Sequence, residues 1–597
     1  MTPEQITAAD DACYLALKAR DARFDGCFFT GVTSTGIYCR PVCSVRAPKR
    51  ENCRFFGLAA QAESAGFRPC LRCRPELAPH SVVWSIQDAS YILAHQAARL
   101  LDEPENWAPT LVASRTALPP EGAELRLGRP GASFMAPTPV ASRTVLPPGG
   151  ALRLQPGPST SSGQAKAGSA APAGEERSSG VIAGLASRLG ISDRHLRRIF
   201  EAQFGVSPVQ YLQTRRLLTA KQLLADTALP ITQVALISGF ASVRRFNAAF
   251  VGHYSLNPTQ LRRQGAPLAG HGIVVRLGYR PPYDVAAMLG FFGRRAIAGV
   301  ELIDADARQP VLRRTLRVDR AGQSHIGWIS AQFDVARSQL LLQVSDTLRE
   351  VLPLVIRRVR AAFDLDADPK AINSVLHASF PTGDGLRVPG ALDGYELAVR
   401  AVLGQQITVA AGRTLAQRLV ERFGERIDTP WPPLTRLFPA PAVLAAASGD
   451  ALGQLGIVRQ RQAAITAIAR AVLDNKLPLH GGTDVQATVE ALKALPGIGD
   501  WTAQYIAMRA LRWPDAFPAG DVALHKALGV QGLKNPAKQA ELASQAWKPW
   551  RSYAVIRAWS GAFAESAAGG WPLPAPETNS VAIDLIAARA HSTWAAA

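Results

Sequence analysis

The spacing of hydrophobic residues divides the chain into segments of different character. From residue 181 to about residue 265, apolar positions recur every three or four residues, which predicts consecutive amphipathic helices. Between residues 273 and 344, short β-branched runs alternate with polar positions, which predicts an antiparallel sheet with interspersed helices. The helical period returns from residue 393 to about residue 563. The pattern therefore predicts two helical regions separated by a sheet.

Two segments have no sustained hydrophobic period. Residues 104–180 are dominated by Pro, Gly, Ala and Ser, which predicts a disordered insertion after a helix at residues 81–103. Residues 566–597 are rich in Ala, Gly and Pro, and we expect a loose tail there. Because the chain has 597 residues, it is too long for one hydrophobic core, and we expect several domains.

Charge indicates the class of partner. The chain has 66 Lys and Arg residues against 47 Asp and Glu residues, a formal net charge of +19, and 47% hydrophobic residues. A globular composition with this positive field favours nucleic acid, although the charge alone would also fit a merely basic soluble protein. No apolar stretch approaches a membrane span, and the first residues lack signal-peptide order. We therefore expect a cytoplasmic protein with no membrane partner.

All seven cysteines lie within the first 73 residues. Cys39 with Cys43 and Cys70 with Cys73 form two close pairs of soft ligands, an arrangement that predicts one tetrahedral zinc site. A reducing compartment argues against disulfides. By itself, a site of this kind more often staples a small domain than takes part in a reaction.

The residues around these cysteines favour a zinc site that takes part in a reaction over a purely structural one. The runs TSTGIYCRPVCSVRAPKREN and SAGFRPCLRC resemble the N-terminal domain of the Ada family, which takes methyl groups from DNA methylphosphotriesters. The resemblance implies a domain at residues 1–80 in which Cys39 is both a zinc ligand and the methyl acceptor, with Cys43, Cys70 and Cys73 as the other ligands. A zinc-bound sulfur stays a thiolate at neutral pH, so we expect a single-turnover acceptor.

Two helix-turn-helix patterns occupy residues 181–268. LASRLGISDRHLRRIF places a tight turn at Gly190, and ITQVALISGFASVRRFNAAF places another at Gly239. One copy alone would more often be an ordinary helical corner, but two copies with basic second helices favour DNA binding. Together they resemble the AraC family of regulators, whose leading helix would lie at residues 81–103. The expected DNA contacts on the second helices are Arg194, His195, Arg197, Arg198, Arg244 and Arg245.

The C-terminal half contains another DNA-binding pattern. ALKALPGIGDWTAQYIAMRAL predicts a helix, a tight hairpin and a second helix. The hairpin glycines permit positive φ and close approach of a phosphate, while free N–H groups of the next helix attract anions. Gly497, Ile498 and Gly499 are the expected backbone contacts. For this hairpin alone, the alternative is a plain interhelical turn.

The hairpin and its surroundings resemble the helix-hairpin-helix glycosylase superfamily. Asp521 lies 22 positions after Gly499, at the place of the superfamily's catalytic aspartate. An Asp before VALHKAL is also an ordinary helix N-cap, and both roles are compatible. YRPPYDVAAMLGFF, GYELAVRAVLGQQIT and WKPWRSYAVIRAW extend the resemblance to the alkyladenine glycosylase family typified by AlkA. It implies an α+β domain at residues 272–390, a helical domain at residues 391–565, and a monovalent cation at the hairpin.

The same resemblance implies an aromatic base pocket. Trp501 and Tyr505 lie at i and i+4 on one helical face, so their rings should form one stacking wall. Trp559 and Phe291 match other aromatic positions of the family pocket. Electron-rich rings favour a cationic base such as 3-methyladenine, which leaves without protonation. Asp521 would then stabilise the developing positive charge of the sugar after the nucleotide is flipped out.

Three departures from related enzymes narrow the reaction. Trp501 stands where lyases of the superfamily carry a Schiff-base lysine, so we expect base release without strand cleavage. Gln406 falls at the family's DNA-wedge position, where an amide would wedge less strongly than an apolar side chain. No cysteine follows Cys73, so we expect neither an iron–sulfur cluster nor a cysteine-dependent O6-methylguanine transferase domain.

The sequence as a whole predicts a multidomain α+β protein with a small four-cysteine zinc domain, an all-α AraC-type double helix-turn-helix domain, an AlkA-type antiparallel sheet domain and an all-α helix-hairpin-helix domain. We expect a monomer that binds alkylated and promoter double-stranded DNA, releases alkylated bases as a monofunctional glycosylase, accepts methyl groups at Cys39 and activates transcription. The alternative is a methylation-responsive regulator whose C-terminal half binds DNA without catalysis.

Overall fold

The computed structural model describes residues 3–79, 89–102, 175–264, 272–304, 309–320 and 322–561. The predicted disordered insertion up to residue 174 and the predicted loose tail lie outside the described residues. One boundary needs correction. Helix α4 begins at Glu175, so residues 175–180, predicted to belong to the insertion, form its first turns. The Glu-Glu-Arg start of this segment has high helix propensity, which accounts for the difference.

The N-terminal domain contains a small four-stranded sheet in the order β3-β1-β2-β4. Its helices and strands are α1 (Pro3–Ala19), β1 (Phe29–Val32), β2 (Ile37–Cys39), β3 (Cys53–Phe56), α2 (Ala59–Ser64) and β4 (Arg68–Pro69). β2 pairs in parallel with β4, so both strands end at the same edge of the sheet. β2 ends at Cys39, and Cys70 directly follows β4, so this pairing brings the two predicted cysteine pairs together.

The double helix-turn-helix domain is helical throughout its described residues. Its helices are α3 (Ala89–Asp102), α4 (Glu175–Arg188), α5 (Asp193–Phe204), α6 (Pro208–Asp226), α7 (Ile231–Ile237), α8 (Val243–Tyr254) and α9 (Pro258–Gln264). The predicted turn glycines, Gly190 and Gly239, have φ of 68° and 82°, a region that favours glycine. Ser192 and Ser242 cap α5 and α8 through their hydroxyls. Helix α3 packs against α5 and α6 in one apolar core.

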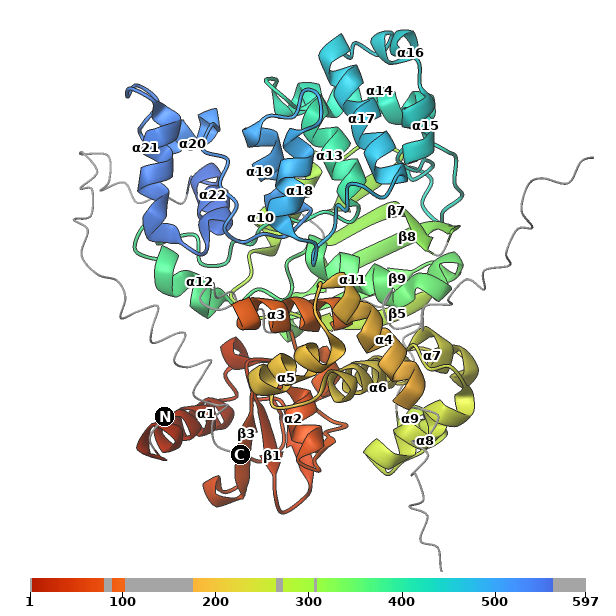
Figure 1. Ribbon diagram of the computed structural model, residues 1–597, viewed down its shortest axis with the longest axis vertical. Helices are drawn as coiled ribbons and strands as arrows, with labels where there is room; N and C mark the ends of the chain where they lie inside the picture. Colours follow the sequence, from red (N-terminus) through yellow and green to blue (C-terminus); the bar gives the residue numbers. More distant parts are fainter. Residues whose placement is uncertain are drawn as a thin grey trace, which may run out of the picture.

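The next domain is built on a five-stranded antiparallel sheet in the order β5-β9-β8-β7-β6, as the alternating pattern predicts. Its helices and strands are β5 (Ile273–Gly278), α10 (Val285–Gly293), β6 (Glu301–Asp304), β7 (Val311–Arg320), β8 (Gln323–Asp334), β9 (Gln339–Val344), α11 (Leu352–Ala362) and α12 (Pro369–Leu376). Figure 1 shows this sheet between the helix-turn-helix region below and the C-terminal helices above.

The C-terminal domain is a helical layer with its own apolar core. Its helices are α13 (Gly394–Leu403), α14 (Val409–Phe423), α15 (Pro441–Ala446), α16 (Gly449–Gly453), α17 (Arg459–Leu473), α18 (Val485–Lys493), α19 (Asp500–Arg509), α20 (Val522–Ala527), α21 (Pro536–Ala543) and α22 (Arg551–Trp559). Although α12 precedes it in the chain, Ile372 and Leu376 of α12 are buried in the same core. None of the helices in the described part of the chain combines the length and apolar character of a membrane span.

Helix α6 joins the N-terminal half to the sheet. Strand β5 lies at the sheet edge, and the main-chain N–H and C=O of Arg276 bond to α6: the N–H donates to Asp226 Oδ2 at 3.1 Å, and Gln222 Nε2 donates to the C=O at 2.7 Å. Polar side chains of α6 thus partner the main chain of an edge strand. The apolar core of α6 to α8 is continuous with that of the sheet.

The N-terminal domain with the four paired cysteines takes part in the same junction. Arg74 and Arg276 each donate an NH1 bond of 2.6 Å to Asp226 Oδ1, and the Asp226 side chain is fully buried. Lys221 forms a buried ion pair with Glu76 and also donates to the Cys70 carbonyl at 3.3 Å. Three parts of the chain therefore meet at one buried charge cluster. A cavity of about 450 Å³ lies beside it, between the two halves of the protein and away from Asp521.

Candidate active site and metal centre

The four predicted metal ligands come together in the N-terminal domain. The Sγ atoms of Cys39, Cys43, Cys70 and Cys73 all lie within 4.8 Å of one another. Tetrahedral zinc–thiolate bonds of about 2.3 Å require sulfurs roughly 3.8 Å apart, so this donor set fits one zinc ion. Cys43 and Cys70 are buried, whereas Cys39 and Cys73 are partly exposed.

Arg40 stabilises the loop that carries the metal ligands. Its main-chain N–H donates to Cys73 Sγ at 3.3 Å, and its NH1 donates to the Cys73 carbonyl at 3.0 Å. The rest of the guanidinium pairs with buried Asp25. Bonds from an N–H to a ligand sulfur are the usual outer support of a metal centre because they orient the ligand.

The predicted DNA-contact residues lie at the N-terminal ends of α5 and α8. Arg194, Arg198 and Arg244 are exposed. Arg197 is half-buried and pairs with Asp193 at 3.2 Å, while Arg198 NH2 and His195 Nδ1 lie 2.9 Å apart. On α8, Arg245 is half-buried. The exposed guanidiniums are available to phosphates or base edges.

The predicted hairpin lies between α18 and α19, but its two glycines adopt different conformations. Gly497 has φ of +76°, the left-handed region, whereas Gly499 has φ of −91° and serves as the N-cap of α19. Positive φ therefore applies to Gly497 alone. A Cβ atom at Gly499 would meet nothing within 4 Å, so the space before the first turn of α19 is open to a phosphate.

Gln405 connects the hairpin to the loop that carries Gln406. Its Nε2 donates to the Gly497 carbonyl at 2.9 Å and to Thr502 Oγ1 at 3.0 Å. Arg461 of α17 donates to the Gln405 carbonyl. The next residue, Gln406, is exposed and has φ of 54°. The loop is thus held by three surrounding elements while Gln406 projects from the protein.

Asp521 caps α20 and also accepts hydrogen bonds from two indole groups. As the N-cap of α20, its Oδ1 accepts from the main-chain N–H of Leu524 at 2.7 Å. In addition, Trp559 Nε1 donates to Oδ1 at 3.0 Å and Trp501 Nε1 donates to Oδ2 at 2.9 Å. Both carboxylate oxygens are therefore held by N–H donors. The carboxylate plane is fixed against the aromatic side chains, which is the preorganisation that an electrostatic role requires.

The predicted aromatic wall is present around this carboxylate. Trp501 and Tyr505 stack with ring centroids 5.3 Å apart and planes 10° apart, and Tyr505 lies 6.4 Å from the ring of Trp559. Burial alone would raise the pKa of the Tyr505 phenol, but the guanidiniums of Arg509 and Arg295 more than offset burial and lower that pKa. Arg509 NH1 donates to the Tyr505 hydroxyl at 2.5 Å.

Arg509 connects Phe291 to the aromatic wall, because its guanidinium contacts the rings of both Phe291 and Tyr505. The guanidinium carbon of Arg509 lies 4.8 Å from the Phe291 centroid and 5.3 Å from the Tyr505 centroid. Arg295 covers Phe291 at 3.7 Å. Neither arginine was predicted from the sequence. Helical spacing offered a signal, because Arg509 lies four residues after Tyr505 and Arg295 four residues after Phe291.

Sequence profiles of four protein families match consecutive parts of the chain. The metal binding domain of Ada matches residues 12–76, and a helix-turn-helix domain matches residues 185–264. The AlkA N-terminal domain matches residues 274–393, and the HhH-GPD superfamily of base excision DNA repair proteins matches residues 399–552. Each profile falls on the part of the structure that the sequence assigns to that type of domain.

Individual relatives cover most of the chain or single parts of it. The probable bifunctional transcriptional activator/DNA repair enzyme AlkA of Mycobacterium tuberculosis is 33% identical over 562 residues, covering 92% of this chain and 96% of that protein. DNA-3-methyladenine glycosylase 2 of Escherichia coli K12 is 36% identical over 283 residues, 47% of this chain and 95% of that protein. Regulatory protein Ada of Salmonella typhimurium is 52% identical over 67 residues, 11% of this chain and 19% of that protein.

These matches agree with the geometry of both sites. The four-cysteine cluster lies in an Ada-type metal-binding domain, and the carboxylate among aromatic rings lies in a base-excision glycosylase domain. Helix-turn-helix and glycosylase domains both act on DNA, so DNA is the partner of this chain. The chain belongs to the family of bifunctional transcriptional activators and DNA repair enzymes of the AlkA type.

Proposed function

We propose that the C-terminal half hydrolyses the glycosidic bond of alkylated bases in duplex DNA, with Asp521 as its catalytic residue. The observation that carries this proposal is the carboxylate held by the indole N–H groups of Trp501 and Trp559 beside the stacked ring of Tyr505. A flipped, cationic base would stack on these rings, because electron-rich aromatic faces attract positive charge. The base and the carboxylate are thereby placed side by side.

The reaction then follows from the charges. The bond from the sugar C1′ to the base nitrogen breaks, and the bonding electron pair leaves with the cationic base, which becomes neutral. Asp521 stabilises the positive charge left on the sugar, and water adds to C1′ and releases a proton. Since Trp501 offers no amine for a Schiff base, the product is an abasic site in an intact strand.

The surrounding contacts position the duplex. The main-chain N–H groups of Gly497 and Gly499 would contact a backbone phosphate, and a monovalent cation at the hairpin would complete that contact. The N–H of Ile498 instead donates to the Leu495 carbonyl at 3.3 Å. Gln406 fills the gap that the flipped nucleotide leaves.

Asp521→Asn tests the glycosylase. An asparagine oxygen still caps α20 and accepts from Trp559 while the charge is lost, but the asparagine NH2 group would face the indole N–H of Trp501. We expect release of 3-methyladenine to fall by roughly 10² or more, the scale for loss of one preorganised contact, with binding to damaged DNA largely preserved. The matched control is Asp484→Asn, since Asp484 is the exposed N-cap of α18 and accepts from Ala487 N at 3.0 Å.

Two outcomes would contradict this assignment. The catalytic role of Asp521 fails if Asp521→Asn releases bases as fast as Asp484→Asn does. The prediction of hydrolysis without strand cleavage is contradicted if the unmodified protein nicks DNA in the absence of added alkali. In the first case, the C-terminal half would be a DNA-binding part of a methylation-responsive regulator.

We further propose that Cys39 accepts a methyl group from a DNA methylphosphotriester. Its partial exposure supports this role, because Cys43 and Cys70 are buried and the Cys73 sulfur accepts the main-chain N–H of Arg40. Bound zinc would keep the ligand sulfurs as thiolates. The Cys39 sulfur forms a bond to the methyl carbon, the methyl C–O bond breaks, and its electron pair restores the phosphodiester anion. The loss of one negative charge from the sulfur cluster then reduces repulsion from DNA and favours promoter binding through α5 and α8.

Mass spectrometry of tryptic peptides tests this step. After exposure to methylphosphotriester DNA, we expect one added methyl on Cys39 and one zinc per chain before and after transfer. A methyl on Cys43 or Cys70, or a purified chain without zinc, would contradict the proposal.

We also propose that the chain is a monomer and that it acts in the cytoplasm.

A further inference from the structure

Two guanidinium groups hold aromatic rings on one side of the base pocket. Arg509 NH1 donates to the Tyr505 hydroxyl at 2.5 Å, and its guanidinium carbon lies 4.8 Å from the Phe291 centroid. The guanidinium carbon of Arg295 lies 3.7 Å from the same centroid. Burial raises the pKa of the Tyr505 phenol, but the charges of Arg509 and Arg295 outweigh burial and lower that pKa. The positions of both rings therefore depend on where the two arginines are held.

The two arginines are anchored in different domains. Arg509 lies on α19 of the helical domain and donates to the carbonyls of Pro389 and Gly390 at 2.8 and 3.1 Å. Arg295 follows α10 of the sheet domain, and its NH1 donates to the Phe291 carbonyl at 3.3 Å, within its own turn. A bond within one turn does not fix Arg295 relative to α19. Contacts of its main chain have to do so.

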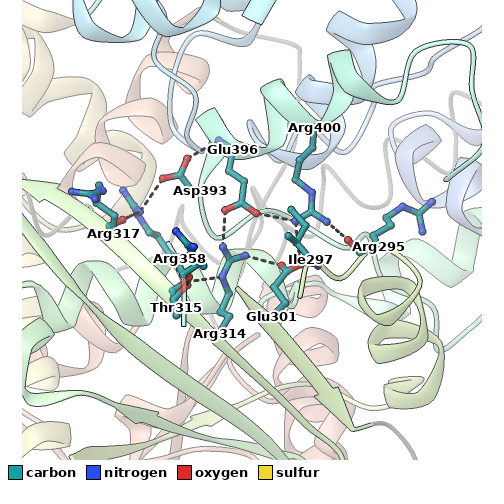
Figure 2. Close-up of polar contacts among 11 residues, drawn as sticks. Arg295, Ile297, Glu301, Arg314, Thr315, Arg317, Arg358, Asp393, Glu396 and Arg400 are labelled. Carbon is teal, nitrogen blue, oxygen red and sulfur yellow. Dashed lines mark hydrogen bonds and ion pairs between the residues drawn. The ribbon is translucent and has the colours of Figure 1, made fainter. Parts of the chain in front are cut away.

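A cluster of four charged side chains reaches that main chain. Arg314 of β7 donates to Glu301 of β6 at 2.9 Å and to Glu396 of α13 at 2.6 Å. Arg400 of α13 donates through NH1 to the same two carboxylates, at 3.1 and 2.8 Å, and through NH2 to the Arg295 carbonyl. Figure 2 shows the four side chains between the sheet and α13, with Arg400 reaching Arg295.

The cluster forms a buried seam between the two domains. The side chains of Glu301, Glu396 and Arg314 are no more than 6% exposed, and each has two charged partners. Glu301 also accepts from the main-chain N–H of Ile297 at 3.2 Å, which fixes the turn after α10 at a second point. Because fully paired charges away from water resist rearrangement, the seam holds the turn that carries Arg295.

The shape of the guanidinium is important at Arg400. Its planar fork lets NH1 bond to two carboxylates while NH2 reaches the Arg295 carbonyl. A lysine would keep a positive charge beside Glu301 and Glu396, but its donors lie on a single nitrogen that cannot occupy both positions. Arg400→Lys therefore removes the tether to Arg295 and retains the charge.

We propose that Arg400 is a positioning residue for base release. From α13, Arg400 holds the carbonyl of Arg295. Through Arg295, it keeps Phe291 and Tyr505 in the positions where a flipped base stacks. This inference rests on the proposed glycosylase function. It extends that function by giving the sheet domain a part in base release, through the turn after α10.

Single-turnover release of 3-methyladenine from one duplex, with the full chain in saturating excess, tests the proposal. As long as folded chain saturates the duplex, the rate constant does not depend on the folded fraction, so a loss of folded protein does not imitate a positioning effect. Affinity for the same duplex is measured separately. The variants are Arg400→Lys, Arg295→Met and the two combined. Arg314→Lys is the matched control, because Arg314 bonds to the same carboxylates and not to Arg295.

We expect Arg400→Lys to lower the rate constant about tenfold, because small displacements at a reacting site slow a reaction strongly. Affinity for the duplex should change less than about twofold, and the rate constant of Arg314→Lys should stay within about threefold of the unchanged chain. The combined variant should be no slower than Arg295→Met alone, because the effects of residues that act as a unit are not additive.

A second variant covers the case in which Arg400→Lys yields no folded protein. Glu396→Gln weakens one of the two carboxylate partners of Arg400 and should slow base release in the same way. Its effect should likewise disappear when it is combined with Arg295→Met.

The proposal is overturned if Arg400→Lys releases base as fast as Arg314→Lys does. It is also overturned if the combined variant is slower than Arg295→Met by the full factor of Arg400→Lys, since additive effects mean that Arg400 does not act through Arg295. If the unchanged chain releases no 3-methyladenine, the proposed glycosylase function itself fails, which is a different outcome.

Discussion

Asp226 should control how firmly the two halves of the protein are joined. Its buried carboxylate accepts from Arg74 of the zinc domain and from both the side chain and the main-chain N–H of Arg276 on β5. Asp226→Asn keeps the shape of the side chain but removes the negative charge between two guanidiniums. The junction then holds like charges together, and one amide hydrogen faces a donor.

The structure sets the size of this effect. Removing one member of a buried ion pair costs about 3–5 kcal/mol. Here the side chains of Arg74 and Arg276 are 15% and 26% exposed, and Arg74 keeps its bond to Glu76. We therefore expect a loss at the lower end, about 3 kcal/mol. A loss of that size corresponds to about a hundredfold higher population of the opened junction.

Native-state hydrogen exchange measures this opening directly, since unfolding of a multidomain chain is not a single transition. The main-chain amide of Arg276 and the last turn of α6 should exchange about a hundredfold faster in Asp226→Asn. The control is Asp346→Asn, which removes an exposed pair with Arg349 and should change exchange little. Equal exchange of β5 in the two variants would refute the importance of this junction.

Two further predictions concern tethers elsewhere. Gln405→Met should slow base release about tenfold, because the Gln405 amide holds the Gln406 loop to the hairpin. Single-turnover rates of base release are compared with those of Gln417→Met, the control, because the Gln417 amide forms hydrogen bonds with the main chain of Ala298 and not with the hairpin. A hydrogen bond from His253 to Glu63 raises the His253 pKa, so its stabilisation is full below about pH 6.5 and is lost as pH rises through the folded pKa. The midpoint of the thermal transition that unfolds the N-terminal domain and α8 should fall from about pH 6 to pH 8 by more in the unchanged chain than in His253→Asn; equal falls would count against a stabilising role of this hydrogen bond.

Features that depend on short spacings could be predicted from the sequence. The turns at Gly190 and Gly239 and the stacked pair of Trp501 and Tyr505 follow from neighbours within one or two helical turns. Local geometry determines each of them, because helix periodicity and positive φ are properties of a few consecutive residues.

Features that depend on tertiary packing could not be predicted. Trp501 and Trp559 both donate to Asp521, yet they lie 20 and 38 positions from it in sequence. Their rings were expected in the pocket, but the direction of each indole N–H depends on how α19, α20 and α22 pack. The junction at Asp226 is more remote still, since Arg74 is 152 positions away. An aspartate at a helix end is common in sequences, and only its partners in the folded protein identify Asp226 as part of the junction.

The shared junction also determines how the two DNA-binding parts of the chain relate to each other. Opening it would expose the apolar core common to α6–α8 and the sheet, and would separate buried Asp226 from Arg276 of β5. Each 1.4 kcal/mol of such cost makes the opened form ten times rarer. Helices α5 and α8 are therefore held in a fixed orientation relative to the hairpin at Gly497. Because a bend of the duplex costs only a few kcal/mol, a DNA molecule that contacts both parts has to adapt its path to the protein.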